Sequence, residues 1–229
     1  MERKDFLKNG IFGLTTVLTG VVIASDNKNR SNIPDDDCNV SPGETKGPFP
    51  TKTPAQMVQS NITSDRTGIA LLINFTILDN SNKCSPLSGA DVDIWHCDKD
   101  GNYSEYGNHP MQRNDLTSAH FLRGRQTTDV KGRVSFLSIY PGWYHGRAPH
   151  IHIEIFDKAG KSLLVTQVAF PENISTKVYS SPLYASRGEA DTPNNRDYVF
   201  SDSLSEQMAT VTGNVNDGFT LSSRIVVKS

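Results

Sequence analysis

The sequence predicts a mainly β protein, a β-sandwich with long loops and few short helices. Short runs of apolar and β-branched residues recur along the chain, and several alternate with polar residues, as strands with one buried face do. Gly, Pro, Asp and Asn turn signals separate these runs, and hardly any stretch shows the period of a helix. Strands at short, regular intervals are typical of two packed sheets.

The chain is large enough for one domain with a hydrophobic core, because its 229 residues include 36% hydrophobic residues. We expect this domain to span residues 38–229. The formal net charge is −2 and no long basic run occurs, so nothing in the sequence indicates a nucleic-acid partner.

Residues 1–25 have the composition of an export signal. Arg3, Lys4 and Lys8 precede an apolar run over residues 11–24 that ends in small residues. The run is too short for a convincing membrane span, so we expect removal of the segment and no stable membrane insertion afterwards; a retained anchor is the alternative. Residues 3–8 resemble a twin-arginine motif with lysine in the second position. The sequence therefore predicts an exported protein, periplasmic or secreted.

Residues 26–37 are rich in Asn, Ser and Asp, which is typical of an exposed linker. Three cysteines follow: Cys38, Cys84 and Cys97. In an exported chain an odd number leaves one thiol unpaired or joined to another molecule. A Cys84–Cys97 bridge would close a small loop, and Cys38 is an alternative partner for either, so the pairing stays open.

The domain itself begins with a Gly- and Pro-rich loop over residues 41–50, and Thr53-Pro54 is typical of the start of one or two helical turns through Gln59. We expect strands over residues 68–78, 90–97, 123–128, 133–139, 150–156, 162–170 and 219–227. Residues 171–200 contain few long apolar runs and indicate a long excursion with short helices.

The strand over residues 150–156 carries a candidate site. Ile151, Ile153 and Ile155 share one face of this strand, whereas His150 and His152 project from the other. Cα atoms two residues apart on a strand lie about 6.5 to 7 Å apart, which allows both rings to bind one metal ion. The alternative is a histidine pair that only completes a surface, and the pattern favours the metal site.

Two tyrosines are predicted to reach the same neighbourhood. Tyr103 follows the turn at residues 98–102, and Tyr144 follows the Pro-Gly turn at residues 141–142. Phenolate oxygens combined with neutral imidazoles favour the trivalent Fe(III) over Zn(II) or Cu(II). Four protein ligands would leave a position open for substrate. Taken alone, either tyrosine fits better as a strand-end residue with a buried ring and a wet hydroxyl.

These residues lie in segments that resemble the intradiol ring-cleavage dioxygenases, in their exported, single-chain branch. The resemblance is carried by residues 87–104, which include Tyr103, by residues 121–129, by residues 140–147 and by the histidine pair at 150 and 152. Gly47-Pro48-Phe49 is similar to the family's Gly-Pro-aromatic loop. The similar segments follow one another in the family's order between residues 38 and 170, so together they are far more specific than any one of them.

The resemblance implies an Fe(III)-dependent dioxygenase that cleaves the ring of catechols between the two hydroxylated carbons. Its partners would be a small aromatic diol and O2, and its products would be of the cis,cis-muconate type. The residues that the resemblance assigns to the iron are Tyr103, Tyr144, His150 and His152. No second basic residue near these positions demands a carboxylated substrate, so catechols without a carboxyl group are favoured by a small margin.

The resemblance also implies roles beside the metal. Tyr144 would leave the iron when catechol binds, and Arg147 would stabilise negative charge that develops on the substrate ring. Gln167 would support the centre through hydrogen bonds; a strand residue that bonds the backbone is almost as good an interpretation. Phe49 and Trp143 would line the substrate pocket.

Two other functions are compatible with part of the pattern. A non-catalytic extracytoplasmic β-sandwich that binds carbohydrate or protein would need no such set of phenols, imidazoles and guanidinium. A zinc hydrolase would need a general-base carboxylate beside the histidines, and only Glu154 shares their face of the strand.

Overall fold

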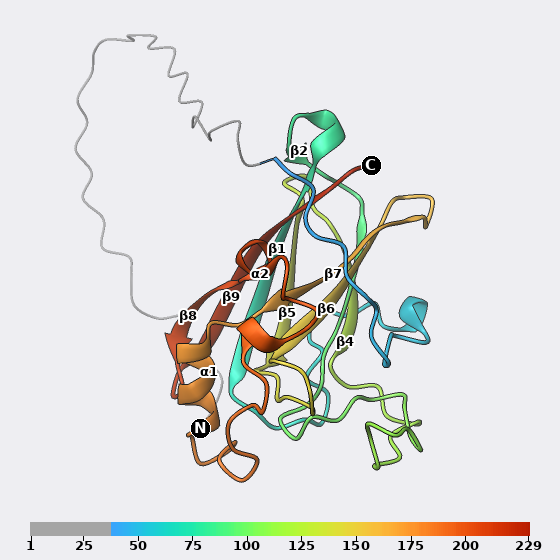
Figure 1. Ribbon diagram of the computed structural model, residues 1–229. Helices are drawn as coiled ribbons and strands as arrows, with labels where there is room; N and C mark the ends of the chain where they lie inside the picture. The colour runs from blue at the N-terminus through green and yellow to red at the C-terminus, as the bar shows by residue number, and fades with distance from the viewer. Residues whose placement is uncertain (1–37) are drawn as a thin grey trace, which may run out of the picture. The chain divides into compact units, whose positions relative to one another are not determined.

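Two β-sheets contain most of the regular structure of residues 38–229, the part of the chain that the computed structural model describes. The predicted export signal and linker lie outside the described residues. The five-stranded sheet consists of β1 (Ala70–Asp79), β2 (Ser85–Pro86), β5 (Arg133–Ile139), β8 (Thr210–Asn214) and β9 (Gly218–Val227). The four-stranded sheet consists of β3 (Asp91–Trp95), β4 (Arg123–Thr127), β6 (His150–Phe156) and β7 (Ser162–Ala169) (Figure 1).

The two sheets differ in their pairing. β1 pairs with β5 and β2 in antiparallel orientation and with β9 in parallel orientation, and β8 lies at the edge beyond β9. The second sheet has the order β4-β3-β6-β7 and is antiparallel throughout. The histidine-bearing strand β6 is therefore an inner strand, with β3 on one side and β7 on the other.

The inner faces of the sheets meet in one hydrophobic core. Leu71, Ile73 and Phe75 of β1 belong to the same buried cluster as Ile151 and Ile153 of β6, and each is at most 1% exposed. The predicted alternation of β6 is confirmed, since its isoleucines face this core. The two packed sheets confirm the predicted β-sandwich.

The helices are few and short, as predicted. Within residues 38–229 they are α1 (Glu172–Tyr179), α2 (Leu204–Gln207) and the 3₁₀ turns η3 (Pro54–Gln56), η4 (Asn80–Asn82) and η5 (Asn194–Arg196). The helix expected from residue 54 to Gln59 stops at Gln56. The reason is a competing pairing with β4, since the Arg125 backbone N–H donates to the Met57 carbonyl at 2.7 Å and Val58 forms a bridge with Arg125.

All seven expected strands are present, with ends that differ by up to two residues from the expected ones. β2, which has two residues, and β8 were not predicted from the sequence. In β8 only Val211 is apolar and the other positions are exposed or hold Gly213, so the strand lacks the alternation by which the others were found.

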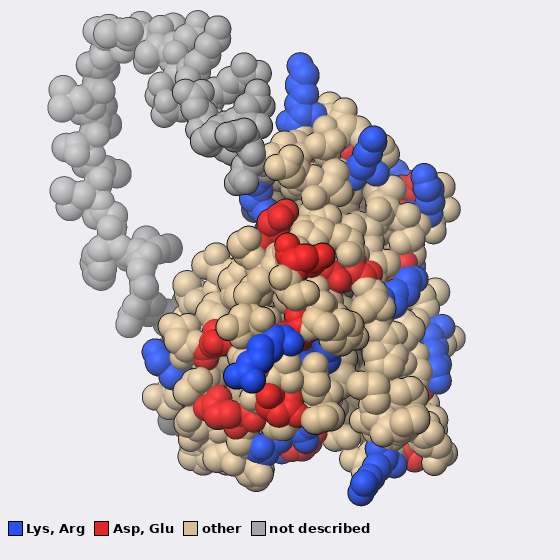
Figure 2. All heavy atoms as spheres, viewed as in Figure 1, with Lys and Arg blue, Asp and Glu red and all other residues tan. Residues whose placement is uncertain are grey.

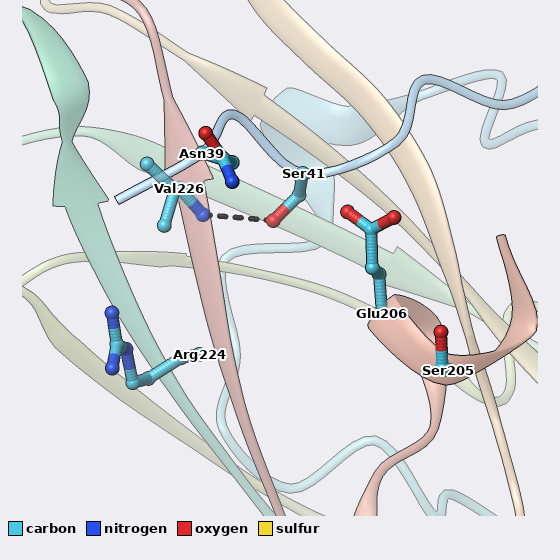
Figure 3. Close-up of a pocket in the computed structure, with 6 residues that line it drawn as sticks. All are labelled: Asn39, Ser41, Ser205, Glu206, Arg224 and Val226. Atoms are coloured by element: carbon cyan, nitrogen blue, oxygen red, sulfur yellow. Dashed lines mark hydrogen bonds between the residues drawn. The ribbon is translucent and has the colours of Figure 1, made fainter. Parts of the chain in front are cut away.

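A disulfide decides the cysteine pairing that the sequence left open. Cys38 is bonded to Cys84, with a Cα–Cα distance of 5.8 Å, and Cys97 is a free, buried thiol. The segment after Cys38 is also tied to β9, because the Ser41 hydroxyl accepts a 3.0 Å hydrogen bond from the Val226 backbone N–H (Figure 3). The shallow hollow beside this contact, about 380 Å³ in volume, contains none of the predicted site residues.

The surface carries charges of both signs. Figure 2 shows Lys and Arg side chains interspersed with Asp and Glu on one face of the molecule. Within residues 38–229, no helix has the length and hydrophobicity that a bilayer crossing requires.

Candidate active site

The register of the four-stranded sheet sets four side chains in a row on the sheet face opposite the core. Arg123 lies across from Trp95, Trp95 across from His152, and His152 across from Gln167. Side chains of directly paired residues in antiparallel strands share a face, so these strands bring the row together. The indole of Trp95 stacks flat on the His152 ring, with centroids 5.0 Å apart and an interplanar angle of 2°.

The two histidines of β6 converge at their Nε2 atoms, which lie 3.1 Å apart. His150 Nδ1 lies 2.6 Å from the Ala148 carbonyl, so this nitrogen carries the proton and Nε2 keeps its lone pair for the site. Both rings are at least 97% buried. Burial is the main cause that holds the pKa of both imidazoles well below the ordinary histidine value, which keeps them neutral and able to act as ligands.

Tyr103 reaches the histidines from the loop after β3. The Asp98 carboxylate shapes this loop by accepting hydrogen bonds from the backbone N–H groups of Asp100 and Asn102, at 3.0 and 2.9 Å. The Tyr103 hydroxyl lies 3.4 Å from His150 Nε2 and has no exposed surface. Burial raises the pKa of this phenol well above its ordinary value, and the nearby Tyr144 adds to the shift.

Tyr144 approaches from the loop between β5 and β6. Its ring meets that of Tyr103 edge to face at 5.7 Å and that of His150 at 5.5 Å. Its hydroxyl accepts a long hydrogen bond, 3.4 Å, from Arg147 Nη1. Burial raises the pKa of Tyr144 to about 12, although the charge and hydrogen bond of Arg147 act to lower it.

Arg147 is buried beside these groups and contacts three of the other predicted site residues, Tyr144, His150 and Gln167. Its Nη1 lies 3.4 Å from both the Tyr144 hydroxyl and His150 Nε2. Its Nη2 donates a 2.6 Å hydrogen bond to Gln167 Oε1, and its Nε contacts the buried carboxylate of Asp197. Hydrogen bonds thus hold the guanidinium at Nε and Nη2. Its Nη1 faces Tyr144 and His150, two of the candidate metal ligands.

This set of donors fits an oxidised iron ion. Among residues 38–229, no three or more His, Cys, Asp or Glu side chains gather as a metal cluster, so the candidate centre depends on two imidazoles together with two phenols. The imidazoles are neutral, and the pKa values of the buried phenols are raised even with Arg147 nearby. Both phenols therefore need a metal ion beside them to ionise. Phenolate oxygen with imidazole nitrogen is a set that suits Fe(III).

Gly47, in the amino-terminal loop over residues 41–50, lies beside the His152 ring. Its φ is +67°, and a Cβ atom there would lie 2.8 Å from His152 Cε1. Glycine is the residue that permits both this backbone conformation and this close approach. The His152 ring therefore has the Gly47 backbone close by and stacks on Trp95, while its Nδ1 has no hydrogen-bond partner among the described residues.

The chain is similar to known proteins in both sequence and fold. The family model described as Dioxygenase matches residues 47–187, a range that includes Gly47 and both pairs of candidate ligands. A solved intradiol ring-cleavage dioxygenase from Tetranychus urticae is similar with a TM-score of 0.75 and 29% identity, over 83% of this chain and 95% of its own. The chain belongs to the intradiol ring-cleavage dioxygenase family.

Two curated relatives are similar over part of their length. The protocatechuate 3,4-dioxygenase beta chain of Burkholderia cepacia is 34% identical over 113 residues, which cover 45% of this chain and 46% of the relative. The chlorocatechol 1,2-dioxygenase of Rhodococcus opacus is 30% identical over 126 residues, which cover 47% and 46%. This member of the intradiol family therefore matches about half the length of each.

Phe49 and Trp143, the two residues predicted to line the substrate pocket, have surroundings that differ from each other. Phe49 is buried, stacks on the Tyr103 ring at 4.7 Å and meets the Tyr144 ring edge on at 6.3 Å, so it lies against both phenols. Trp143 instead packs at the edge of the main core, where its indole N–H donates to the Gly188 carbonyl and its ring stacks with Arg187. Contact of either residue with substrate stays a prediction.

Glu154 does not serve as a base for the histidines. Its carboxylate pairs with Lys46 at 2.7 Å and accepts a hydrogen bond from Ser162, two strand positions away from His152. The zinc-hydrolase alternative thus has no carboxylate in contact with either imidazole among the described residues.

Arg123 and Asp197 contribute to the site of this family member but were not predicted from the sequence. Arg123 has no exposed surface, and Asp197 has none either, although charged side chains are rarely buried. Asp197 follows η5 in the region where the sequence showed only a long excursion, and the family match ends before it. The only signal there is an acid within the aromatic stretch Asp197-Tyr198-Val199-Phe200, which carries no spacing typical of a site.

Proposed function

We propose that this family member is an Fe(III)-dependent intradiol dioxygenase that cleaves catechols between the two hydroxylated carbons with O2, giving products of the cis,cis-muconate type. The observation that carries the proposal is the position of His150 Nε2, which lies 3.4 Å from the Tyr103 hydroxyl and 3.1 Å from His152 Nε2, with the Tyr144 ring packed against the rings of Tyr103 and His150. Family membership supports the reaction type.

The iron would be held by Tyr103, Tyr144, His150 and His152. When bound, Fe(III) would supply a Lewis acid that polarises an aromatic diol toward attack by O2. The burial of all four side chains keeps water from competing for these donors.

Tyr144 and Arg147 have complementary roles in this proposal. Tyr144, ionised as a ligand of the iron, would take up a proton from the incoming catechol on its phenolate oxygen and become a neutral phenol, and the adjacent Arg147 Nη1 donates its N–H toward the same oxygen. A fixed, permanently charged guanidinium stabilises negative charge on the substrate without any proton transfer of its own. Gln167 Oε1 accepts a hydrogen bond from Arg147 Nη2, which helps to fix the orientation of the guanidinium.

The test is the colour and oxygen consumption of the purified, iron-loaded protein. Phenolate ligation of Fe(III) should give a wine-red protein with O2 uptake on a panel of plain, alkylated, hydroxylated and carboxylated catechols. Tyr144→Phe should shift or remove the visible band and lower turnover by on the order of 100-fold or more, and His152→Ala should remove both.

Tyr184→Phe is the matched control. It removes a buried phenol that donates to the Tyr140 carbonyl in the main core, so colour and turnover should persist. A colourless protein with stoichiometric iron, or full turnover in Tyr144→Phe, would overturn the proposal.

A further inference from the structure

Asp197 is a fully buried carboxylate outside the segment that the family model matches. It caps the C-terminal end of η5, where its own backbone N–H donates to the carbonyls of Pro193 and Asn194 at 3.1 and 3.2 Å. These two hydrogen bonds fix the backbone of Asp197 independently of the contacts of its side chain.

The carboxylate receives hydrogen bonds on both oxygens. Arg147 Nε lies 2.9 Å from Oδ1 and 2.8 Å from Oδ2, the Ala148 backbone N–H donates to Oδ2 at 2.8 Å, and the Val199 backbone N–H donates to Oδ1 at 2.9 Å. Every one of these neighbours is a donor. An amide in the same place would turn its NH2 group toward one of them, so the surroundings select a carboxylate.

The surroundings of Arg147 leave one end of the guanidinium directed at the candidate metal ligands. Asp197 accepts a hydrogen bond from Nε, and Gln167 accepts one from Nη2. The rings of Tyr198 and Phe200 lie 5.7 and 5.6 Å from Cζ. A planar guanidinium fixed at two nitrogens has no freedom left at the third. Nη1 is the nitrogen that remains, and it points toward the Tyr144 hydroxyl and His150 Nε2.

We propose that Asp197 is a positioning residue that holds the Arg147 guanidinium so that Nη1 faces the reacting centre. The proposal rests on the proposed function, because Arg147 acts there on the substrate. Asp197 also balances the buried charge of Arg147, which would otherwise be costly to keep in this site. A segment beyond the family match thereby determines the geometry of a group inside it.

The first test uses iron-loaded Asp197→Asn. Its iron content and visible band should match the wild-type protein, while kcat falls about 100-fold, as expected for a misplaced charge-stabilising group, and KM changes by less than about threefold. In an Arg147→Lys background, Asp197→Asn should lower kcat no further, because the guanidinium that it positions is absent.

Asp191→Asn is the matched control, since the Asp191 carboxylate also serves the 145–147 loop. It accepts from His145 Nδ1 and from the Gly146 backbone N–H but does not contact Arg147. Its kcat should equal that of the wild-type protein.

The second test needs no iron. In the metal-free protein, Asp197→Asn and Arg147→Gln should each lower the unfolding temperature, and the double variant should lose less than the sum of the two losses. Additive losses would overturn the pairing. If Asp197→Asn does not fold, Asp197→Glu keeps the charge and displaces the guanidinium, and an unchanged kcat in that variant would overturn the positioning role.

The two proposals fail in different ways. A wild-type protein that binds iron without colour or O2 uptake removes the proposed function. A coloured, active wild-type protein with equal kcat in Asp197→Asn removes only the role of Asp197.

Discussion

Gly47 shows how closely one backbone position is fitted to the candidate metal ligands. The Trp95 indole stacks on the His152 ring, and the backbone of Gly47 lies so close to His152 Cε1 that an added Cβ would clash with it, so both neighbours restrict the ring. The orientation of Nε2 is therefore fixed by steric contact, while the hydrogen bond of His150 Nδ1 to the Ala148 carbonyl fixes the other ring. Two different physical devices orient the two imidazoles.

We expect Gly47→Ala to weaken iron binding as well as stability. The added Cβ would meet His152 Cε1 at 2.8 Å and force the ring away, at a cost of about 1 to 3 kcal/mol beyond the strain of the positive φ. Gly160→Ala is the control, because Gly160 has φ +81° but no atom within 4 Å of the added Cβ. Urea unfolding and iron titration of both variants test this, and equal iron affinity in the two would contradict the steric explanation.

At this scale the sequence could predict residues but not all their partners. Tyr103, Tyr144, His150, His152, Arg147 and Gln167 lie together, and the family's motifs had already grouped them. Asp197 had no such signal, because its contact with Arg147 joins residues 50 apart through an irregular segment. Only the three-dimensional path of that segment reveals it.

At the scale of elements, β4 does more than complete a sheet. Its first residue, Arg123, donates from Nη1 to the Phe49 carbonyl at 2.9 Å, from Nη2 to the Ser104 carbonyl at 2.7 Å and from Nε to the Ser104 hydroxyl at 2.9 Å. The loop that carries Phe49 and the loop that carries Tyr103 are thus tied to one strand. The strands could be predicted from their alternation, whereas this link between loops could not.

Arg123→Met should lower the free energy of unfolding by about 3 to 5 kcal/mol, since it leaves the buried carbonyls of Phe49 and Ser104 without their donor and removes the guanidinium charge from beside the buried Glu105 carboxylate. Arg133→Met on β5 is the control. Arg133 forms an exposed ion pair with Asp129, and its loss should cost clearly less. Urea denaturation of both proteins measures the difference, and a similar loss in the two would refute the proposed role of Arg123 as the tie between loops.

For the whole molecule, stability depends on histidines kept neutral inside the fold. His96 has its Nδ1 2.8 Å from the Cys97 carbonyl and its Nε2 2.7 Å from the Ser138 hydroxyl, and burial lowers its pKa to about 4. Unfolding returns this pKa to its ordinary value near 6.5. The unfolded chain therefore binds more protons between these values, and stability falls as the pH falls through that window.

The metal-free protein should accordingly lose about 2 kcal/mol of stability between pH 7 and pH 5 from His96 alone. His150 and His152 act in the same direction, because burial also lowers their pKa values. His96→Gln should show a visibly smaller loss over this range when urea unfolding is followed at pH 7, 6 and 5. The same pH dependence in both proteins would argue against a neutral, buried His96.

The cysteine pairing belongs to this largest scale as well. Sequence spacing left three pairings open, and the structure joins Cys38 to Cys84 across a separation of 46 residues. Which thiols meet depends on how β1 and the turn after it return to the amino-terminal segment. The local sequence around each cysteine does not show that path, so it could not predict the pairing.

The parallel pairing of β1 with β9 has a consequence during synthesis. β1 is translated early and its neighbour β9 late, and the Ser229 backbone N–H even reaches the Asp79 carboxylate across 150 residues. A ribosome therefore exposes β1 with one edge unpaired for most of the time that the chain is being made. The sheet of β3, β4, β6 and β7 uses strands from the middle of the chain only, so all the strands of the sheet that carries the histidines have been synthesised before β9, the parallel neighbour of β1.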